Sequence, residues 1–351
     1  MDTPTEISIA GRRIGTAHPP YVIAELSANH NGSLDTALAI VEQAKLCGAD
    51  AVKLQTYRPD TITLDSAAPD FCIEGGLWAG RTLYDLYQEA HMPWEWHAPL
   101  FERARQLGIT IFSSPFDATA VDLLDQLGAP AFKIASFEAV DLPLIRYAAS
   151  KGKPLIISTG MANLAEIGEA VEAALSGGCK EVAILHCVSG YPAPAEEYNL
   201  RTIPDLIRQF GRVTGLSDHT LDNTTAITSV ALGAAIIEKH FTLDRRGGGP
   251  DDSFSLEPEQ LAALCKDSLT AWRALGKVDY GQQSSERANV KFRRSLYFVR
   301  PLKAGQAITS DDVRSVRPGY GLPPKMLDQL VGRTVRRDVA AASPVTPGDL
   351  A

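Results

Sequence analysis

Two histidines that follow neighbouring apolar runs are the residues of this sequence best suited to holding a metal ion. His219 lies in the polar turn SDHT after the apolar segment 212–216, and His240 ends the apolar run 234–239. We interpret this stretch as strand, loop, helix and strand. Both imidazoles then fall at the carboxyl ends of adjacent parallel strands, where α/β folds keep their chemistry. Neutral imidazoles that converge there suit a divalent cation, whereas each one taken alone is equally well explained as an ordinary loop histidine.

Two lysines inside apolar strands are a second unusual feature. Lys53 in AVKLQ and Lys133 in AFKIA would be buried, which is costly unless each charge meets an anion. Serines follow several of the same strands, and the combination predicts a cradle for a phosphate or a carboxylate. Two alternatives stay open: a structural ion pair between each lysine and a nearby glutamate, and a Schiff-base lysine of the kind that barrel aldolases use. The serines are Ser113, Ser114, Ser136, Ser158 and Ser217.

The elements that must position these residues repeat as an apolar strand followed by an amphipathic helix. Strands are expected at 21–26, 50–56, 110–113, 131–135, 154–158, 181–187, 212–216 and 234–240, with helices between them and a last helix at 258–275. Strands that are apolar throughout indicate a parallel sheet covered by helices. Eight such units in roughly 250 residues predict an α/β fold of the (β/α)8 TIM-barrel type. A doubly wound sheet is the alternative, but the first strand runs into ELSANHNGS, which lacks the glycine-rich phosphate loop often found there.

The repeat ends near Gly281, so residues 1–281 are predicted to form the barrel domain. This domain would include a short hairpin at 7–14 and a long insertion at 57–91. Residues 282–294 are polar and basic, which is typical of a linker. Residues 295–351 contain short strand-like pieces between turns and predict a small β-rich domain of about 60 residues. A domain that small would need to pack on the barrel or on a second subunit.

Composition narrows the class of protein. The chain has 351 residues, 45% of them hydrophobic, which is ample for a large core. No apolar run approaches the ~18 residues needed to span a bilayer, and no signal peptide is visible. The five scattered cysteines include no CxxC pair and indicate reduced thiols, so a cytoplasmic protein is expected. A net charge of −8 argues against nucleic acid or an anionic membrane as a partner, but it does not exclude a small anionic substrate.

A series of motifs, taken in chain order, resembles the sialic acid synthase family. They are IAELSANHNG, ADAVKLQTY, FSSPFD, FKIASFE, IISTGMA, LHCVSGYPAP, GLSDHT, EKHFTLDR and GPDDSFSLEP. The later stretches FRRSLY, ITSDDVRSVRPGYGL and VGR resemble the antifreeze-like, or SAF, domain of that family. The match runs from about Tyr21 to near the C-terminus. Many motifs in register are far more specific than any one of them.

The resemblance implies a reaction and a role for each matched residue. Members of the family condense phosphoenolpyruvate with an open-chain amino-sugar aldehyde and use a divalent metal, here expected to be Mn²⁺, Mg²⁺ or Co²⁺. By motif, His219 and His240 resemble the metal ligands, and Glu25 resembles the acid beside the metal and the aldehyde. The residues that resemble phosphoenolpyruvate contacts are Lys53, Lys133, Ser136, Ser158, Ser217 and either Ser113 or Ser114. Those that resemble sugar contacts are Gln55, Glu138, Tyr191 and Asp251.

Three further expectations follow from the resemblance. Sialic acid synthases usually have Asn at the position of Ser189, and the segment GLWAGRTLYDLYQEAHMPWEWH is most similar to the pseudaminic acid synthase branch. The expected substrate is therefore a 2,4-diacetamido-2,4,6-trideoxy-altrose, with N-acetylneuraminate or legionaminic acid synthesis as alternatives. Arg317 in VRPG resembles an arginine that the SAF domain inserts into the partner's barrel in a domain-swapped homodimer. A metal-dependent aldolase and a non-catalytic sugar-binding protein are the more distant alternatives.

Overall fold

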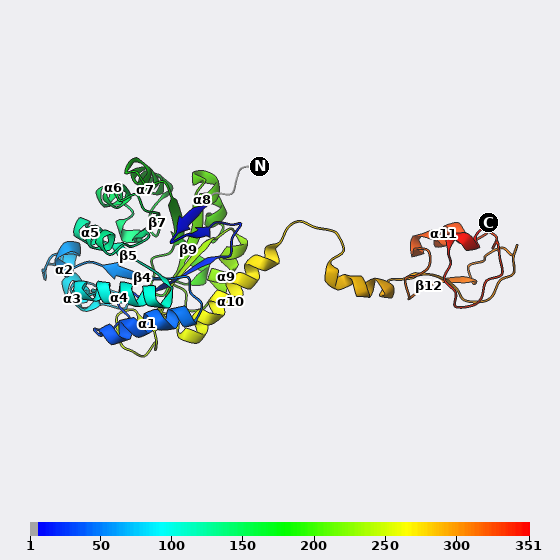
Figure 1. Ribbon diagram of the computed structural model, residues 1–351, viewed down its shortest axis with the longest axis horizontal. Helices are drawn as coiled ribbons and strands as arrows, with labels where there is room; N and C mark the ends of the chain where they lie inside the picture. Colours follow the sequence, from blue (N-terminus) through cyan, green and yellow to red (C-terminus); the bar gives the residue numbers. More distant parts are fainter. Residues whose placement is uncertain (1–5) are drawn as a thin grey trace. The chain divides into compact units, whose positions relative to one another are not determined.

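The computed structural model describes residues 6–351, and this part of the chain forms two compact units, one ending at Gly276 and one spanning Lys277–Ala351 (Figure 1). Within the described residues, the first unit holds eight parallel strands that close into a barrel. Their order around the barrel is β10 (Ile236–His240), β3 (Tyr21–Glu25), β4 (Ala51–Thr56), β5 (Thr110–Pro115), β6 (Phe132–Ile134), β7 (Leu155–Ser158), β8 (Val182–Cys187) and β9 (Val213–Asp218). The predicted (β/α)8 barrel is confirmed, and the doubly wound alternative is wrong.

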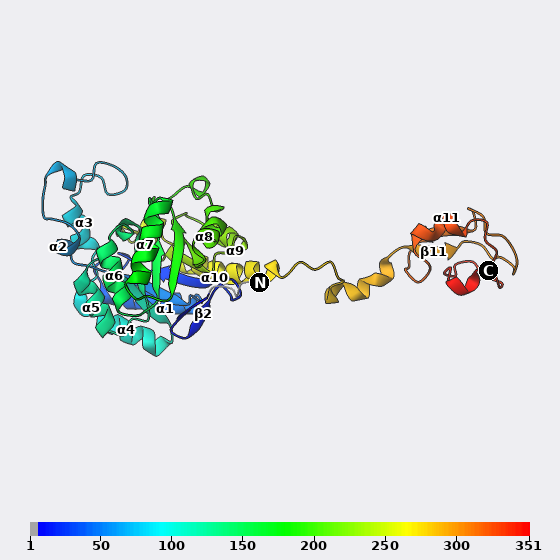
Figure 2. The same cartoon turned by 90° about the horizontal axis from the view of Figure 1, so that it is seen from above.

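Helices between successive strands cover the outside of the barrel (Figures 1 and 2). They are α1 (Leu34–Leu46), α4 (Trp94–Leu107), α5 (Ala118–Gln126), α6 (Leu142–Ser150), α7 (Leu164–Ser176), α8 (Thr202–Phe210), α9 (Thr224–Ala231) and α10 (Pro258–Leu275). Several of these helices are preceded by a short polar side chain that caps their first turn. Asp117, for example, accepts hydrogen bonds from the first backbone N–H groups of α5, and Asn163 does so for α7. These caps fix where each helix leaves the strand-end loop that precedes it.

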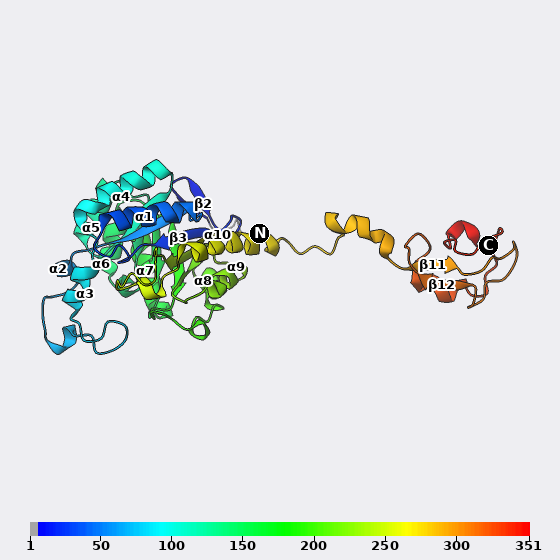
Figure 3. The same cartoon turned by 90° about the horizontal axis from the view of Figure 1, so that it is seen from below.

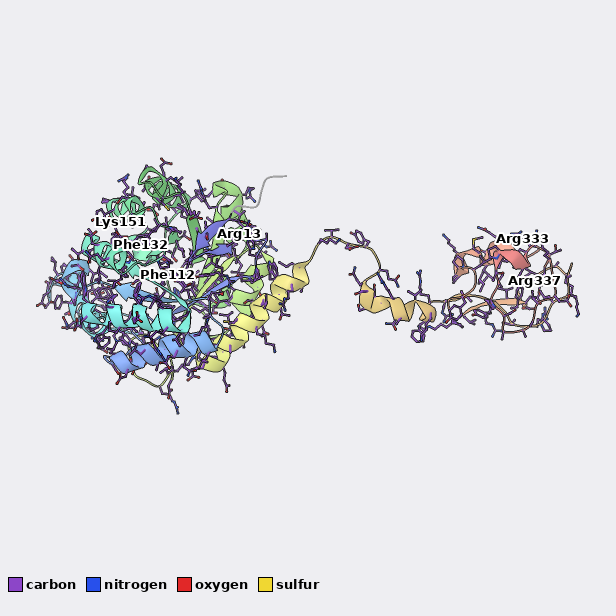
Figure 4. All side chains as sticks on the ribbon, in the orientation of Figure 1. Arg13, Phe112, Phe132, Lys151, Arg333 and Arg337 are labelled. Carbon is purple, nitrogen blue, oxygen red and sulfur yellow. The ribbon has the colours of Figure 1, made fainter. Side chains whose placement is uncertain are left out.

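The barrel unit has two apolar cores that share the strands between them. One lies between strands and helices, and the other fills the inside of the barrel. Phe132 belongs to the outer core and Phe112 to the inner one (Figure 4). The inner core also receives Ile7 and Ile9 from β1 (Ile7–Ile9) and Ile14 from β2 (Arg12–Ile14), so the predicted N-terminal hairpin is present. It packs against residues at the amino ends of the strands and leaves the opposite mouth to the polar side chains.

The insertion after β4 is structured. It contains α2 (Pro59–Ile62), the 3-10 turn η1 (Pro69–Phe71) and α3 (Leu83–Ala90). Figures 2 and 3 show part of it as a loop that projects near α2 and α3. Another difference lies at β9, which continues through Ser217 and Asp218, residues that the sequence predicted to lie in a loop.

The second unit has its own small core, formed by residues such as Leu296, Phe298 and Leu330. In it, β11 (Ser295–Phe298) pairs antiparallel with β12 (Val313–Val316), and isolated bridges such as Leu302 to Val339 extend the β structure. The short helix α11 (Leu327–Leu330) and the 3-10 turns η6 (Pro324–Met326) and η7 (Pro347–Asp349) complete the fold. Part of the predicted linker is not extended, because Ser284–Phe292 form the 3-10 helix η5. No helix in residues 6–351 is long and apolar enough to cross a membrane.

Candidate active site

We call the open end of the barrel, at the carboxyl ends of its strands, the mouth. Along each strand, the polar side chains of the mouth occupy the same alternate positions, that is, the same parity, as the residues of the inner core. Glu25 follows Ile23 by two residues, and Lys53 follows Ala51 in the same way. Successive strand side chains alternate between faces, so each of these groups points into the barrel above an apolar neighbour. The same relation holds for Ser114, Lys133, Ser158, Cys187 and Glu238. Ser217 and His240 have the same parity, four residues beyond Val213 and Ile236 of the inner core. One end of the barrel interior is therefore polar, while the other is filled with aliphatic and aromatic side chains.

The two lysines predicted to face an anion lie on either side of one carboxylate. Lys53 Nζ is 3.7 Å and Lys133 Nζ is 3.8 Å from Glu238 Oε1. Lys53 Nζ is also 2.6 Å from Glu25 Oε2. All four side chains are buried. Two ammonium groups and two carboxyl groups thus lie together away from water, which is the geometry that the ion-pair alternative predicts.

Serine hydroxyls from several strands surround this network. Lys133 Nζ donates to Ser158 Oγ at 2.7 Å, and Lys53 Nζ donates to Ser114 Oγ at 3.3 Å. Ser217 Oγ donates to Glu238 Oε1 at 3.3 Å. Lysine ammoniums and rotatable hydroxyls within reach of one another form the donor set that an incoming phosphate or carboxylate requires.

Burial and charge act in opposite directions on these groups. Burial raises the pKa of Glu25 to about 7, although Lys53 opposes the shift. Burial also lowers the pKa of Lys133, while for Lys53 the carboxylates of Glu238 and Glu25 outweigh burial and raise its pKa. Gln55 Nε2 donates to Glu25 Oε1 at 3.0 Å and holds that carboxyl group in the mouth. A carboxyl group with a pKa near neutrality can give or take a proton at physiological pH.

The histidines from β9 and β10 come together at the same mouth. Their ring centroids are 5.4 Å apart. His219 Nδ1 lies 2.8 Å from the Val188 carbonyl oxygen and must donate a hydrogen bond to it. In its neutral form the ring therefore has its free lone pair on Nε2, the atom that could bind a metal. Burial lowers the pKa of His240 well below its ordinary value, which keeps this ring neutral. His240 Nδ1 has no hydrogen-bond partner among residues 6–351, and the Asp251 carboxylate is 3.8 Å away.

The two imidazoles alone do not complete a metal site. Within the described residues, no group of three or more His, Cys, Asp or Glu side chains has the geometry to hold a metal ion. A cation at these imidazoles would therefore take its other ligands from water or from a substrate. Asp251 is itself engaged, because Ser27 Oγ donates to its Oδ2.

Aromatic rings border the histidines. The Tyr191 ring packs 4.4 Å from that of His219 and 6.0 Å from that of His240, measured between centroids. Phe254 packs against both Tyr191 and His240, at 5.3 and 5.0 Å. The mouth thus has a charged half around the lysines and an aromatic half around the imidazoles. A ligand with an anionic end and a partly apolar end would match both.

Comparison with known proteins agrees with this arrangement. The NeuB family model matches residues 40–280, and the SAF domain model matches residues 293–351. The chain belongs to the NeuB family. The predicted resemblance to the sialic acid synthase family, with its SAF domain, is confirmed.

Several relatives of this NeuB-family chain are pseudaminic, legionaminic or neuraminic acid synthases. It is 41% identical to pseudaminic acid synthase of Campylobacter jejuni over 329 residues, which is 94% of this chain and 96% of that protein. It is 34% identical to N,N'-diacetyllegionaminic acid synthase of the same organism, over 90% of this chain and 96% of that protein. The crystal structure of N-acetylneuraminic acid synthetase from Leptospira borgpetersenii in complex with citrate superposes with a TM-score of 0.73 at 31% identity, covering 83% of this chain and 96% of that one. The protein is an enzyme of this family.

In this NeuB-family barrel, Ser113 is not part of the mouth. Its Oγ lies 2.6 Å from Thr56 Oγ1, which also contacts His97 on α4. Ser113 therefore faces the helices, and the choice left open between the two serines falls on Ser114. His186 also faces outward, where its Nε2 contacts the Tyr198 carbonyl oxygen.

Two residues of the mouth had no substrate or metal role assigned to them from the sequence. Glu238 is the carboxylate between both lysines. Cys187 occupies the inward position on β8; burial would raise its pKa, but the nearby His219 lowers it to about 7. Strand alternation would have found both, because Ile236 and Leu185 of the inner core precede them by two residues.

The remaining predicted residues lie at the rim or in the second unit. Ser136 Oγ accepts a hydrogen bond from the Gly160 backbone N–H at 3.1 Å, and Ser189 Oγ lies 3.9 Å from Cys187 Sγ. Burial raises the pKa of Glu138 to about 7, and its buried Oε2 has no hydrogen-bond partner in the part of the chain that the structure describes. Arg317 is exposed at the end of β12.

Proposed function

We propose that the protein is a pseudaminic acid synthase that joins phosphoenolpyruvate to the aldehyde of an open-chain 2,4-diacetamido-2,4,6-trideoxy-altrose. The products would be a nine-carbon nonulosonic acid and inorganic phosphate. The observation that carries the proposal is the mouth itself, with two buried lysines and several serines on one side and two imidazoles with aromatic rings on the other. The family relationship and the higher identity to the pseudaminic acid synthase than to the legionaminic acid synthase of one organism favour this sugar.

The lysines account for phosphoenolpyruvate binding. Lys53 and Lys133 supply two positive charges, and Ser114, Ser158 and Ser217 supply hydroxyl donors. When an anion enters, the lysines exchange part of their contact with Glu238 for charge-assisted hydrogen bonds to the phosphate. Because these donors come from different strands of a rigid barrel, they position the phosphate without large movement. The inward parity of each donor supports this role.

The imidazoles fit a divalent cation. The contact of His219 with a backbone carbonyl fixes its tautomer. The Nδ1 of the buried His240, which has no partner in residues 6–351, is a polar atom that a cation would satisfy. Mn²⁺, Mg²⁺ or Co²⁺ would accept these nitrogens together with oxygen ligands. Bound there, the cation would act as a Lewis acid toward the aldehyde oxygen.

The other groups account for the later steps. Carbon 3 of phosphoenolpyruvate attacks the aldehyde carbon with the electrons of its C=C bond. Positive charge then develops at carbon 2, and the aldehyde oxygen becomes an alkoxide that takes up a proton from solvent. Water adds at carbon 2, and Glu25 is placed to take its proton because its pKa lies near 7. The tetrahedral intermediate then expels phosphate by cleavage of its C–O bond, and the lysines hold the phosphate. Glu138, Tyr191, Gln55 and Asp251 are proposed to hold the sugar's hydroxyl and acetamido groups.

The enzyme is further proposed to work as a homodimer in the cytoplasm. The small SAF domain has a core of its own, but its exposed Arg317 carries no ion pair that would occupy it, as far as residues 6–351 show. Asp312, a candidate partner on the same domain, is instead paired with Arg300. The guanidinium group of such an arginine can donate hydrogen bonds to a sugar hydroxyl or to an amide oxygen.

The experiment that tests the function is a panel of open-chain amino sugars incubated with phosphoenolpyruvate and each of the three metals. Phosphate release and product mass are recorded, with the diacetamido-trideoxy-altrose, its legionaminic counterpart and N-acetylmannosamine side by side. Phosphoenolpyruvate labelled with ¹⁸O in its bridging oxygen should deliver the label to phosphate, because C–O cleavage leaves that oxygen on phosphorus. Absence of phosphate release with every sugar would exclude the function, and label retained in the sugar acid would exclude the mechanism.

A further inference from the structure

A loop of the β4 insertion reaches the aromatic half of the mouth. The Ile73 N–H donates to the Arg81 carbonyl and the Gly80 N–H donates to the Ile73 carbonyl, each at 2.9 Å, which closes the loop between them. Arg81 also forms a 2.7 Å ion pair with Glu89 of α3. These contacts give the loop a defined shape, and its Trp78 side chain contacts residues of the barrel unit.

Trp78 is held at two points. Its Nε1–H donates to the carbonyl of Pro250, in the loop between β10 and α10, at 3.1 Å. Its ring lies 5.8 Å from the Tyr191 ring at an interplanar angle of 50°. Tyr191 in turn packs on His219. Trp78 therefore extends the aromatic half of the mouth outward from the imidazoles, and its half-buried ring keeps an uncovered surface.

The chemistry of this wall matches the sugar better than phosphoenolpyruvate. The lysines that would bind the anion contact Glu25, Glu238 and serines, whereas Trp78 contacts an aromatic ring and a backbone carbonyl. An indole surface favours methyl and C–H groups over hydroxyls. A 6-deoxy sugar with two acetamido groups presents three methyl groups, while N-acetylmannosamine presents one and has hydroxyls at the other positions.

We infer that Trp78 is a specificity-determining residue: together with Tyr191 it forms an apolar wall that receives the methyl-bearing end of a deoxy diacetamido sugar. The inference rests on the proposed function and deepens it by assigning a part of the chain outside the barrel strands to substrate choice. The Nε1–H bond to Pro250 fixes the plane of the indole. The ring itself provides the selectivity.

The test compares kcat/KM for the diacetamido-trideoxy-altrose and for N-acetylmannosamine, at saturating phosphoenolpyruvate and metal. Trp78→Ala should reduce the ratio of the two values about 10-fold or more, because one missing methyl contact in an apolar pocket changes kcat/KM by roughly 10- to 200-fold. The KM for phosphoenolpyruvate should stay within about twofold, since the lysines are untouched. Leu64→Ala, at an exposed position of the same insertion, is the matched control and should leave the ratio unchanged.

Trp78→Phe separates the ring from its hydrogen bond. It keeps an apolar wall and lacks the donor to Pro250, so its ratio should stay within about threefold of the wild type. A ratio as low as that of Trp78→Ala would show that the hydrogen bond, and not the wall, carries the effect, and would overturn the inference. An equal loss of activity for both sugars in Trp78→Ala would also overturn it, because a structural role moves both values together. A wild-type enzyme inactive on every sugar would instead count against the proposed function.

Discussion

Replacing Lys133 with methionine tests whether the buried lysines bind phosphoenolpyruvate or only stabilise the barrel. The substitution removes an ammonium that lies 2.7 Å from Ser158 Oγ and 3.8 Å from Glu238 Oε1. Methionine keeps an unbranched apolar side chain in the interior. A hydrogen bond to a charged group contributes about 1.5–3 kcal/mol, so the dissociation constant of phosphoenolpyruvate should rise roughly 10- to 150-fold. The fold should survive, because Glu238 keeps Lys53 at 3.7 Å.

Isothermal titration of phosphoenolpyruvate into the protein without sugar measures this constant, and thermal melting measures stability. Lys239→Met is the matched control, since Lys239 is another buried strand lysine but has the opposite parity and lies 2.9 Å from Asp218 Oδ2. Removing it leaves Asp218 buried without that cation, at a cost of about 3–5 kcal/mol. It should lower Tm more than Lys133→Met does while changing the dissociation constant by less than about twofold. An unchanged constant and a lower Tm for Lys133→Met would refute the anion-binding argument.

Three further outcomes are expected. A chelator should abolish activity and Mn²⁺, Mg²⁺ or Co²⁺ should restore it, and His240→Ala should lose turnover by several orders of magnitude; full activity in chelator would contradict the metal proposal. Burial raises the pKa of Glu138 from 4.5 to about 7, so its contribution to stability is full below pH 4.5 and is lost as the pH rises through 7. The Tm of the wild type relative to Glu138→Gln should therefore fall between about pH 4.5 and pH 7 in melting curves and change little above that, and a flat difference would count against the shift. Arg317→Ala and His240→Ala proteins, each inactive alone, should partly recover activity when mixed under conditions that exchange subunits, because one mouth of the mixed dimer carries neither defect; no recovery, with exchange confirmed, would exclude action in trans.

The barrel could be predicted because its signal is local. Strands buried on both faces are continuously apolar, and helices that cover them show apolar residues at helical spacing. The predicted bounds of the last helix, 258–275, agree with α10. The insertion after β4 was not resolved into elements in this way, since its helices are short and its loop is held by contacts with Pro250, far along the chain.

The site shows where such local signals end. A strand pattern that is apolar on both faces does not say which face a given polar residue takes. A charge inside an apolar strand was enough to select Lys53 and Lys133, and position at a strand end selected His240, but the same position selected Ser113 together with Ser114. The parity becomes readable only when one residue of each strand is known to lie in the inner core.

That parity also explains why a barrel can carry this chemistry without losing its fold. Ala51 and Lys53 share one face of β4, and Ile236 and Glu238 share one face of β10. The apolar member of each pair fills the closed end of the barrel, while the charged member meets opposite charge at the open end. Removing a single charge disturbs only the open end, because the apolar layer beneath it keeps its contacts. Lys133→Met should therefore weaken binding with little loss of stability. Lys239→Met should do the reverse, because outward-facing Lys239 joins β10 to Asp218 and to the loop after β9.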